Sequence, residues 1–202
     1  MYKDPDEVSL RAPLLTCLSA LIAGFAPSKS TPTGSSVTFD PPPISHADGA
    51  SPLESYRDEL LSIFTSGSRS AFSRPPALAG LVHLVEIPGF LSSSEVTFCV
   101  SALNDVLSAA ESESDYDLSL SGLIKVAKLY PRIIETSTLP ILFALLPSSA
   151  PSSSSSESEI YRRSLTSLAS LSLHPDLFEI LSLRLLARLE GVCASSFPDP
   201  LE

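Results

Sequence analysis

The pattern that decides the fold is clearest in residues 92–107, which read SSSEVTFCVSALNDVL. Serine followed three residues later by glutamate, as in Ser92–Glu95, is typical of a capping box at a helix start. Apolar residues then recur at intervals of three and four, which places them on one face of a helix. They are Val96, Cys99, Val100, Leu103, Val106 and Leu107. The stretch therefore predicts a helix with one buried face.

The same spacing predicts helices on both sides of this stretch. The predicted helices cover residues 14–25, 53–64, 76–85, 118–130, 131 onward, 138–146, 157–173 and 175–190. The inward residues expected in three of them are Leu14, Cys17, Leu18, Leu21, Ile22 and Phe25; Leu53, Tyr56, Leu60, Ile63 and Phe64; and Leu120, Leu123, Ile124 and Ala127. The final helix has apolar residues on more than one side, which predicts a helix between neighbouring repeats.

Prolines divide these helices at their ends. Pro13, Pro52, Pro131, Pro140 and Pro175 are each expected in or near a first helical turn, where a missing N–H costs least. Ser51 is the expected cap of the helix that contains Pro52. The helix over 76–85 is expected to end before Pro88-Gly89.

Paired helices begin about every 40 residues, near Pro75, Asp117 and Glu157. Two helices per unit at this period are typical of HEAT or armadillo repeats. The sequence thus predicts an all-α, right-handed solenoid of about four helical hairpins. The expected parts are a first-repeat helix (1–26), a flexible Pro/Ser/Thr-rich loop (27–52), HEAT-like repeats (53–147), a serine-rich loop (148–156), a HEAT-like hairpin (157–190) and a tail (191–202).

Composition argues against several classes of function. The formal net charge is −10, and only 13 Lys and Arg residues are present, so direct binding to nucleic acid or to anionic lipid is not expected. The longest apolar stretch, 14–26, is shorter than the roughly 20 residues of a membrane span. Acidic residues precede it, unlike in a secretory signal. Cysteines 17, 99 and 193 are isolated, which favours a reducing compartment and no bound cluster.

No constellation predicts catalysis, a metal or a cofactor. The chain lacks the nucleophile-elbow, P-loop, dinucleotide and zinc-protease motifs. A hydrolase or metalloenzyme would require contact between His83 and His174, which is not expected; His174 is instead expected to cap a helix. The acidic run 111–117 resembles a calcium loop, but Tyr116 and Gly122 stand where such a loop needs glycine and glutamate. It is read as a solvated turn.

Six basic residues are candidates for binding an acidic partner along one edge of the solenoid, the alternative being a merely solvated face. They are Lys125, Lys128, Arg162, Arg163, Arg184 and Arg188.

Three stretches resemble one known family. They are LYPRIIE at 129–135 with TLPILFALLP at 138–147; YRRSL at 161–165; and PDLFEIL at 175–181 leading into RLL at 184–186. In order and spacing they resemble the methyl-methanesulfonate-sensitivity family of DNA repair and transcription proteins, over roughly residues 51–190. These are packing motifs. Members of that family are several times longer, so the chain is expected to be a segment of a longer protein.

The resemblance implies a cytosolic and nuclear HEAT-repeat scaffold for iron–sulphur protein assembly. Such a scaffold joins a WD-repeat partner and a small acidic partner, and it presents apo-proteins of DNA repair, replication and transcription for cluster insertion. The alternative left open is a transport-receptor-like HEAT module that carries protein cargo.

Overall fold

The computed structural model describes residues 5–25, 53–109, 112–146 and 155–196. Every regular element in these ranges is helical, so the predicted all-α class is confirmed. The chain divides into two compact units, Met1–Ser92 and Ser93–Glu202. This division was not predicted. The 40-residue period predicts a first hairpin from the helices over 76–85 and 92–107, but these two helices belong to different units. Each unit is described by itself.

The first unit is built around one central helix. Its elements are α1 (Pro5–Ala23), the short 3₁₀ helix η1 (Glu54–Tyr56), α2 (Arg57–Ser68) and α3 (Arg74–Glu86). Helix α3 packs against both α1 and α2. It is therefore buried on nearly every side, through Ala77, Leu78, Gly80, Leu81, Val82, Leu84 and Val85.

Helix α1 corrects the expectation for Pro13 and for the first apolar face. The helix starts at Pro5, so Pro13 lies in its interior rather than in its first turn. Pro13 is exposed, so its ring lies on the solvent side of the helix. Leu15 and Ile22 are buried, whereas the residues expected inward at 14, 17, 21 and 25 are exposed.

Helix α2 follows a 3₁₀ turn, which changes the register of its apolar face. A 3₁₀ helix advances three residues per turn instead of 3.6, so residues before and after it cannot share one stripe. Leu60 and Phe64 are buried as predicted, but Tyr56, in the 3₁₀ turn, is exposed. Ile63 is exposed as well, because the buried face of α2 continues through Leu61 and Gly67 instead. The predicted cap at Ser51–Pro52 lies outside the described residues.

The turn after α3 has the predicted place and chemistry. The N–H of Phe90 donates to the carbonyl of Ile87 over 3.3 Å, with Pro88 and Gly89 between them. Gly89 has a φ of 72°, a conformation that glycine adopts without strain. Proline followed by such a glycine is typical of a type II turn.

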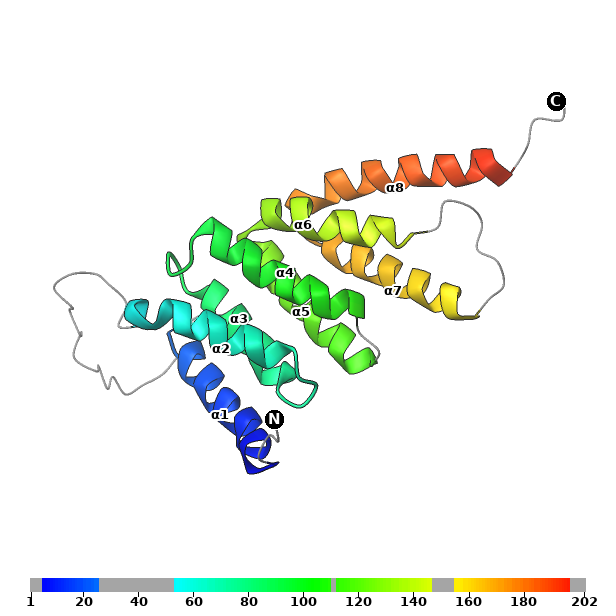
Figure 1. Ribbon diagram of the computed structural model, residues 1–202. Helices are drawn as coiled ribbons and strands as arrows, with labels where there is room; N and C mark the ends of the chain where they lie inside the picture. The colour runs from blue at the N-terminus through cyan, green and yellow to red at the C-terminus, as the bar shows by residue number, and fades with distance from the viewer. Residues whose placement is uncertain (1–4, 26–52, 110–111, 147–154, 197–202) are drawn as a thin grey trace, which may run out of the picture. The chain divides into compact units, whose positions relative to one another are not determined.

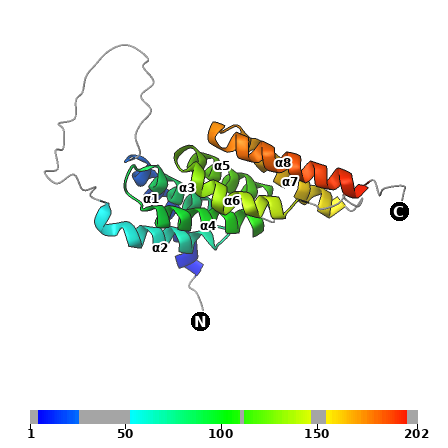
Figure 2. The ribbon, with the colours of Figure 1, turned by 90° about the horizontal axis from the view of Figure 1, so that it is seen from above.

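In the second unit each helix packs against the next and the next but one. Its elements are α4 (Ser93–Ala109), α5 (Glu113–Leu129), α6 (Pro131–Ala144), α7 (Ser155–Ser172) and α8 (Pro175–Ser196). Helix α4 contacts α5 and α6, α5 contacts α6 and α7, α6 contacts α7 and α8, and α7 contacts α8. The result is two rows, α4, α6 and α8 in one and α5 and α7 in the other (Figures 1 and 2).

Helices α4 and α5 confirm most of their predicted faces. All six apolar residues predicted inward on α4 are buried. On α5, Leu120, Leu123 and Ala127 are buried and Ile124 is half-buried. The start of α5 corrects the prediction, because Glu113–Asp117 is helical rather than a turn. The hydroxyl of Ser112 caps it by accepting a 3.1 Å hydrogen bond from the N–H of Asp115.

Helix α6 was wrongly predicted as two helices. It runs unbroken from Pro131 to Ala144 with Pro140 in its interior. Pro140 is exposed, while its neighbours Leu139 and Leu142 are fully buried. Their burial holds the helix together across the hydrogen bond that the proline cannot make.

Helices α7 and α8 are longer than predicted. Helix α7 begins at Ser155, inside the expected serine-rich loop, and α8 continues to Ser196, inside the expected tail. The expected loop 27–52 and residues 148–154 of the expected serine-rich loop lie outside the described residues.

The wide apolar stripe of α8 is only partly covered. Leu177 and Leu181 are buried, but Phe178, Leu186 and Leu189 are 58%, 57% and 59% exposed. Leu183 is exposed as well. Among the described residues, neighbours therefore cover only part of α8, and one apolar face of this helix faces solvent. That neighbouring repeats enclose α8 stays a prediction. No described helix is long and apolar enough to cross a membrane.

Candidate partner-binding surface

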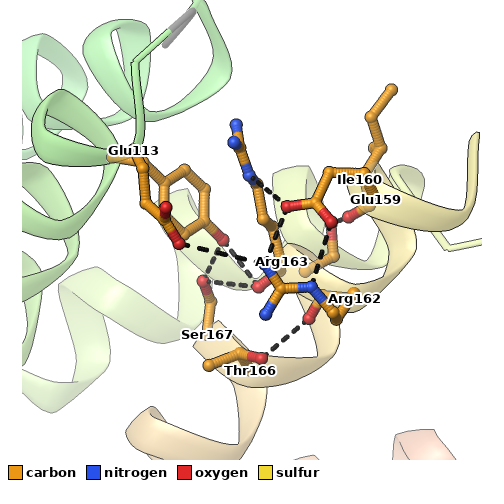
Figure 3. Close-up of polar contacts among 9 residues, drawn as sticks. Glu113, Glu159, Ile160, Arg162, Arg163, Thr166 and Ser167 are labelled. Carbon is orange, nitrogen blue, oxygen red and sulfur yellow. Dashed lines mark hydrogen bonds and ion pairs between the residues drawn. The ribbon is translucent and has the colours of Figure 1, made fainter. Parts of the chain in front are cut away.

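Two of the six basic candidates, Arg162 and Arg163, are held by one carboxylate of their own helix (Figure 3). Arg162 donates to both oxygens of Glu159, from Nη2 over 2.7 Å and from Nε over 3.0 Å. Arg163 donates from Nε to Oε1 of Glu159 over 3.0 Å. The hydrogen bond from Arg162, with that from Arg163, lowers the pKa of Glu159 to about 2. These two charges are already neutralised in part.

The same arginines connect α7 to α5. The guanidinium of Arg163 lies over the ring of Tyr116, 5.6 Å from its centroid, a cation–π geometry. The Tyr116 hydroxyl donates to the carbonyl of Arg163 over 2.6 Å and also hydrogen-bonds the hydroxyl of Ser167. Burial raises the pKa of Tyr116, so it stays a neutral donor. Arg162 also lies 3.9 Å from Glu113 of α5.

These contacts show that α5 and α7 run in the same direction. Residues near the start of α5 meet residues in the first half of α7, and residues near their C-terminal ends share a pocket. Lys125 lies 12 residues after Glu113, about 18 Å further along α5 at 1.5 Å per residue. The exposed Lys125 and Lys128 therefore lie far from the arginine cluster.

The α8 candidates differ from each other. Arg188 is half-buried and donates from Nη2 to the carbonyl of Leu146 over 2.8 Å, which gives it a structural contact at the end of α6. Arg184 is exposed. The six residues thus do not form one continuous basic edge, and their role in binding a partner stays a prediction.

A pocket that was not predicted lies between the C-terminal ends of α5 and α7. Its volume is about 320 Å³, at the lower end for a ligand site. It is lined by Ile124, Ala127, Lys128, Ser170, Leu171, Leu173 and His174. We call it the corner pocket. Nδ1 of His174 is buried without a hydrogen bond, and the nearest carboxylate is that of Asp176, 3.9 Å away.

An acidic groove of about 550 Å³ adjoins it on the other side of the α7–α8 turn. It lies between the first turns of α6 and α8 and is lined by Pro131, Arg132, Glu135, Pro175, Asp176, Leu177, Glu179 and Ile180. Three carboxylates face one guanidinium there, so the groove disfavours a negatively charged ligand.

His83, His174 and Cys99 lie in different parts of the fold, and each has different neighbours. Nδ1 of His83 lies 3.0 Å from Glu86 within α3. The main-chain carbonyl of His174 accepts from the N–H groups of Leu177 and Phe178, so its backbone starts α8. Cys99 is buried, and burial, with the nearby charge of Glu95, raises its pKa to about 12. Within the described ranges, no group of three His, Cys, Asp or Glu side chains is arranged to hold a metal ion.

Periodicity could not have found the corner pocket. Its lining comes from two helices that are not consecutive in the chain, α5 and α7, and from the turn after α7. The one signal in the sequence was Leu173-His174-Pro175, where an apolar residue and an imidazole stand at a helix junction.

No protein-family model matches the chain, and neither the curated proteins nor the solved structures give a match. The family resemblance thus depends on the residues quoted above.

Proposed function

We propose that this chain is a non-catalytic HEAT-type scaffold that acts in cytosolic iron–sulphur protein assembly, in the cytoplasm and nucleus. Its clients would be apo-proteins of DNA repair, replication and transcription. Its own role is to present a helical surface, without a cofactor and without direct contact to nucleic acid or membrane.

The observation that carries the scaffold proposal is the packing order of α4 to α8. Each helix packs against its neighbours and next neighbours along the chain, in two rows. Repeat proteins are built in this way, because each hairpin buries its apolar face against the adjacent hairpins. Such a stack presents long surfaces and little enclosed space, which suits binding other proteins.

The exposed face of α8 agrees with this proposal. Apolar residues that recur over several turns of one helix are a common sign of a protein interface or of a further packed element. Phe178, Leu186 and Leu189 form such a face. Repeat stacks bury such a face against an adjacent hairpin or partner.

The part of the proposal that concerns iron–sulphur proteins is supported by the three quoted stretches alone. They fall on α5 to α8, within the second unit. Their apolar residues are those that pack these helices, such as Ile134, Leu139, Leu142 and Leu177.

Co-purification tests this function. The natural full-length protein that contains this chain is tagged and expressed in its host, and the proteins that co-purify with it are identified by mass spectrometry. We expect a WD-repeat assembly factor, a small acidic partner and iron–sulphur apo-proteins. Their absence, in repeated pull-downs that recover the tagged chain, would refute this function.

The second candidate is a transport-receptor-like module that carries cargo. The exposed helical surfaces favour protein binding in general and serve this function equally well. Binding to a small GTPase in its GTP form but not in its GDP form would select it over the first.

A further inference from the structure

The corner pocket combines an apolar floor with polar groups at its edge. Ile124, Ala127 and Leu171 supply the floor. Lys128, Ser170 and His174 supply the polar groups, and no acidic side chain lines the pocket. A ligand that fits must therefore carry an apolar group and a negatively charged group close together.

One of these polar groups, Lys128, is available to a ligand. Lys128 is exposed and has no ion pair with any described residue. His174 lines the pocket, but its Nδ1 is buried and lies 3.9 Å from the carboxylate of Asp176, so Lys128 is the group that a charged ligand meets.

The surface around the pocket indicates a ligand larger than a metabolite. Leu173 lies at the pocket and is 85% exposed, and Leu129, next to Lys128, is 51% exposed. Apolar surface thus continues outside the pocket, as expected where a chain segment lies across it. The adjoining groove, with Glu135, Asp176 and Glu179, keeps a negatively charged segment on the side of Lys128.

We propose that the corner pocket binds an acidic peptide segment of a partner protein, with one large apolar side chain inserted between α5 and α7 and a neighbouring carboxylate paired with Lys128. This deepens the scaffold function and rests on it, since it names the chemistry of a partner at one place on the surface.

Binding of synthetic peptides to the full chain tests this proposal. The probe is a fluorescein-labelled peptide Gly-Asp-Phe-Glu-Gly-Ser, followed by fluorescence polarisation. Two matched peptides replace the acidic residues by Asn and Gln, or replace Phe by Ala. We expect each replacement to weaken binding about tenfold, as for the loss of one charge-assisted or apolar contact.

Variants of the chain locate the site. We expect Lys128→Glu to weaken the acidic peptide about tenfold, whereas Lys125→Glu, on an exposed position of the same helix outside the pocket, leaves it unchanged. Ser170→Leu fills the pocket and abolishes binding, whereas Thr166→Leu, one turn earlier on α7, does not. Circular dichroism shows whether each variant is folded.

Three results would overturn the proposal: equal binding of the three peptides, equal loss in Lys125→Glu and Lys128→Glu, or binding of decanoate with no binding of any peptide. Failure of the proposed function is distinguishable. If the peptide binds as expected while pull-downs recover no assembly factor, the pocket stands and the iron–sulphur function fails. If pull-downs succeed and Lys128→Glu changes neither them nor peptide binding, only the pocket fails.

Discussion

The ring of Phe64 in α2 lies against the bare backbone of Gly80 in α3, so close that a Cβ on Gly80 would stand 2.1 Å from Cε1 of Phe64. Phe64 is fully buried and cannot swing away. The absence of a side chain at position 80 is what lets these two helices approach.

We therefore expect Gly80→Ala to destabilise the first unit by about 1–3 kcal/mol, because overpacking outweighs the gain of about 1 kcal/mol in helix propensity. Gly191→Ala is the matched control, since nothing lies within 4 Å of its Cβ position in α8. It should be neutral or stabilising by up to about 1 kcal/mol. Urea unfolding of both variants measures this, and a stable Gly80→Ala protein would contradict the packing.

Tyr116 links α5 to α7 through its hydroxyl. Tyr116→Phe removes its hydrogen bonds to the Arg163 carbonyl and to Ser167, while Ser167 keeps its own 3.0 Å bond to that carbonyl. We expect a loss of about 1 kcal/mol in the free energy of unfolding. Tyr56→Phe, at an exposed ring, should change nothing measurable. Equal effects of the two substitutions would show that the link does not stabilise the fold.

Glu159 makes stability depend on acid pH. Its pKa is lowered from 4.5 to about 2 by the hydrogen bonds from Arg162 and Arg163. A carboxylate with a lowered folded-state pKa stabilises the fold above its unfolded pKa, and this contribution is lost as pH falls from about 4.5 to about 2. Because the carboxylate is 42% exposed, the effect is small.

The test compares melting temperatures of the wild-type protein and Glu159→Gln between neutral pH and pH 2. The wild type should melt slightly higher at neutral pH, and the two curves should converge across that acid window. A difference that persists unchanged to pH 2 would contradict the role of Glu159.

The three cysteines should separate by reactivity. Cys17 and Cys193 are exposed, whereas Cys99 is buried with a pKa of about 12 and so remains a thiol at neutral pH. With Ellman's reagent at pH 8, we expect two thiols to react at once and the third only after denaturation. The Cys99→Ala protein should show the same two fast thiols. Rapid modification of Cys99 in the native protein would contradict its burial.

The exposed face of α8 should make the purified chain associate. Phe178, Leu186 and Leu189 expose apolar surface that water solvates poorly. We expect concentration-dependent oligomers in analytical ultracentrifugation, and a shift to monomer on Leu186→Glu with Leu189→Glu. Leu165→Glu, at an exposed leucine of α7, serves as the control and should leave association unchanged. A monodisperse wild-type monomer would contradict this prediction.

Sequence periodicity predicted α4 best, because one helix with a single apolar face leaves its signature in spacing alone. It failed at Pro140, where propensity favours a break. The burial of Leu139 and Leu142 against neighbouring helices outweighs that preference. It failed likewise at Tyr56, because a 3₁₀ turn before α2 changes the register in a way that no residue count reveals. It failed at Ile63 because packing against α3 selects the neighbouring face of α2, which contains Leu61 and Gly67.

By itself, the sequence determined that the chain is helical, where most helices lie, and that Pro88-Gly89 turns the chain, since each of these depends on local backbone preferences and on spacing along one element. Only the tertiary structure decided which apolar faces are covered, how Glu159 holds two arginines beside Tyr116, and which residues line the corner pocket. These features join residues from separate helices, and the distance between two helices is set by side-chain packing rather than by either segment alone.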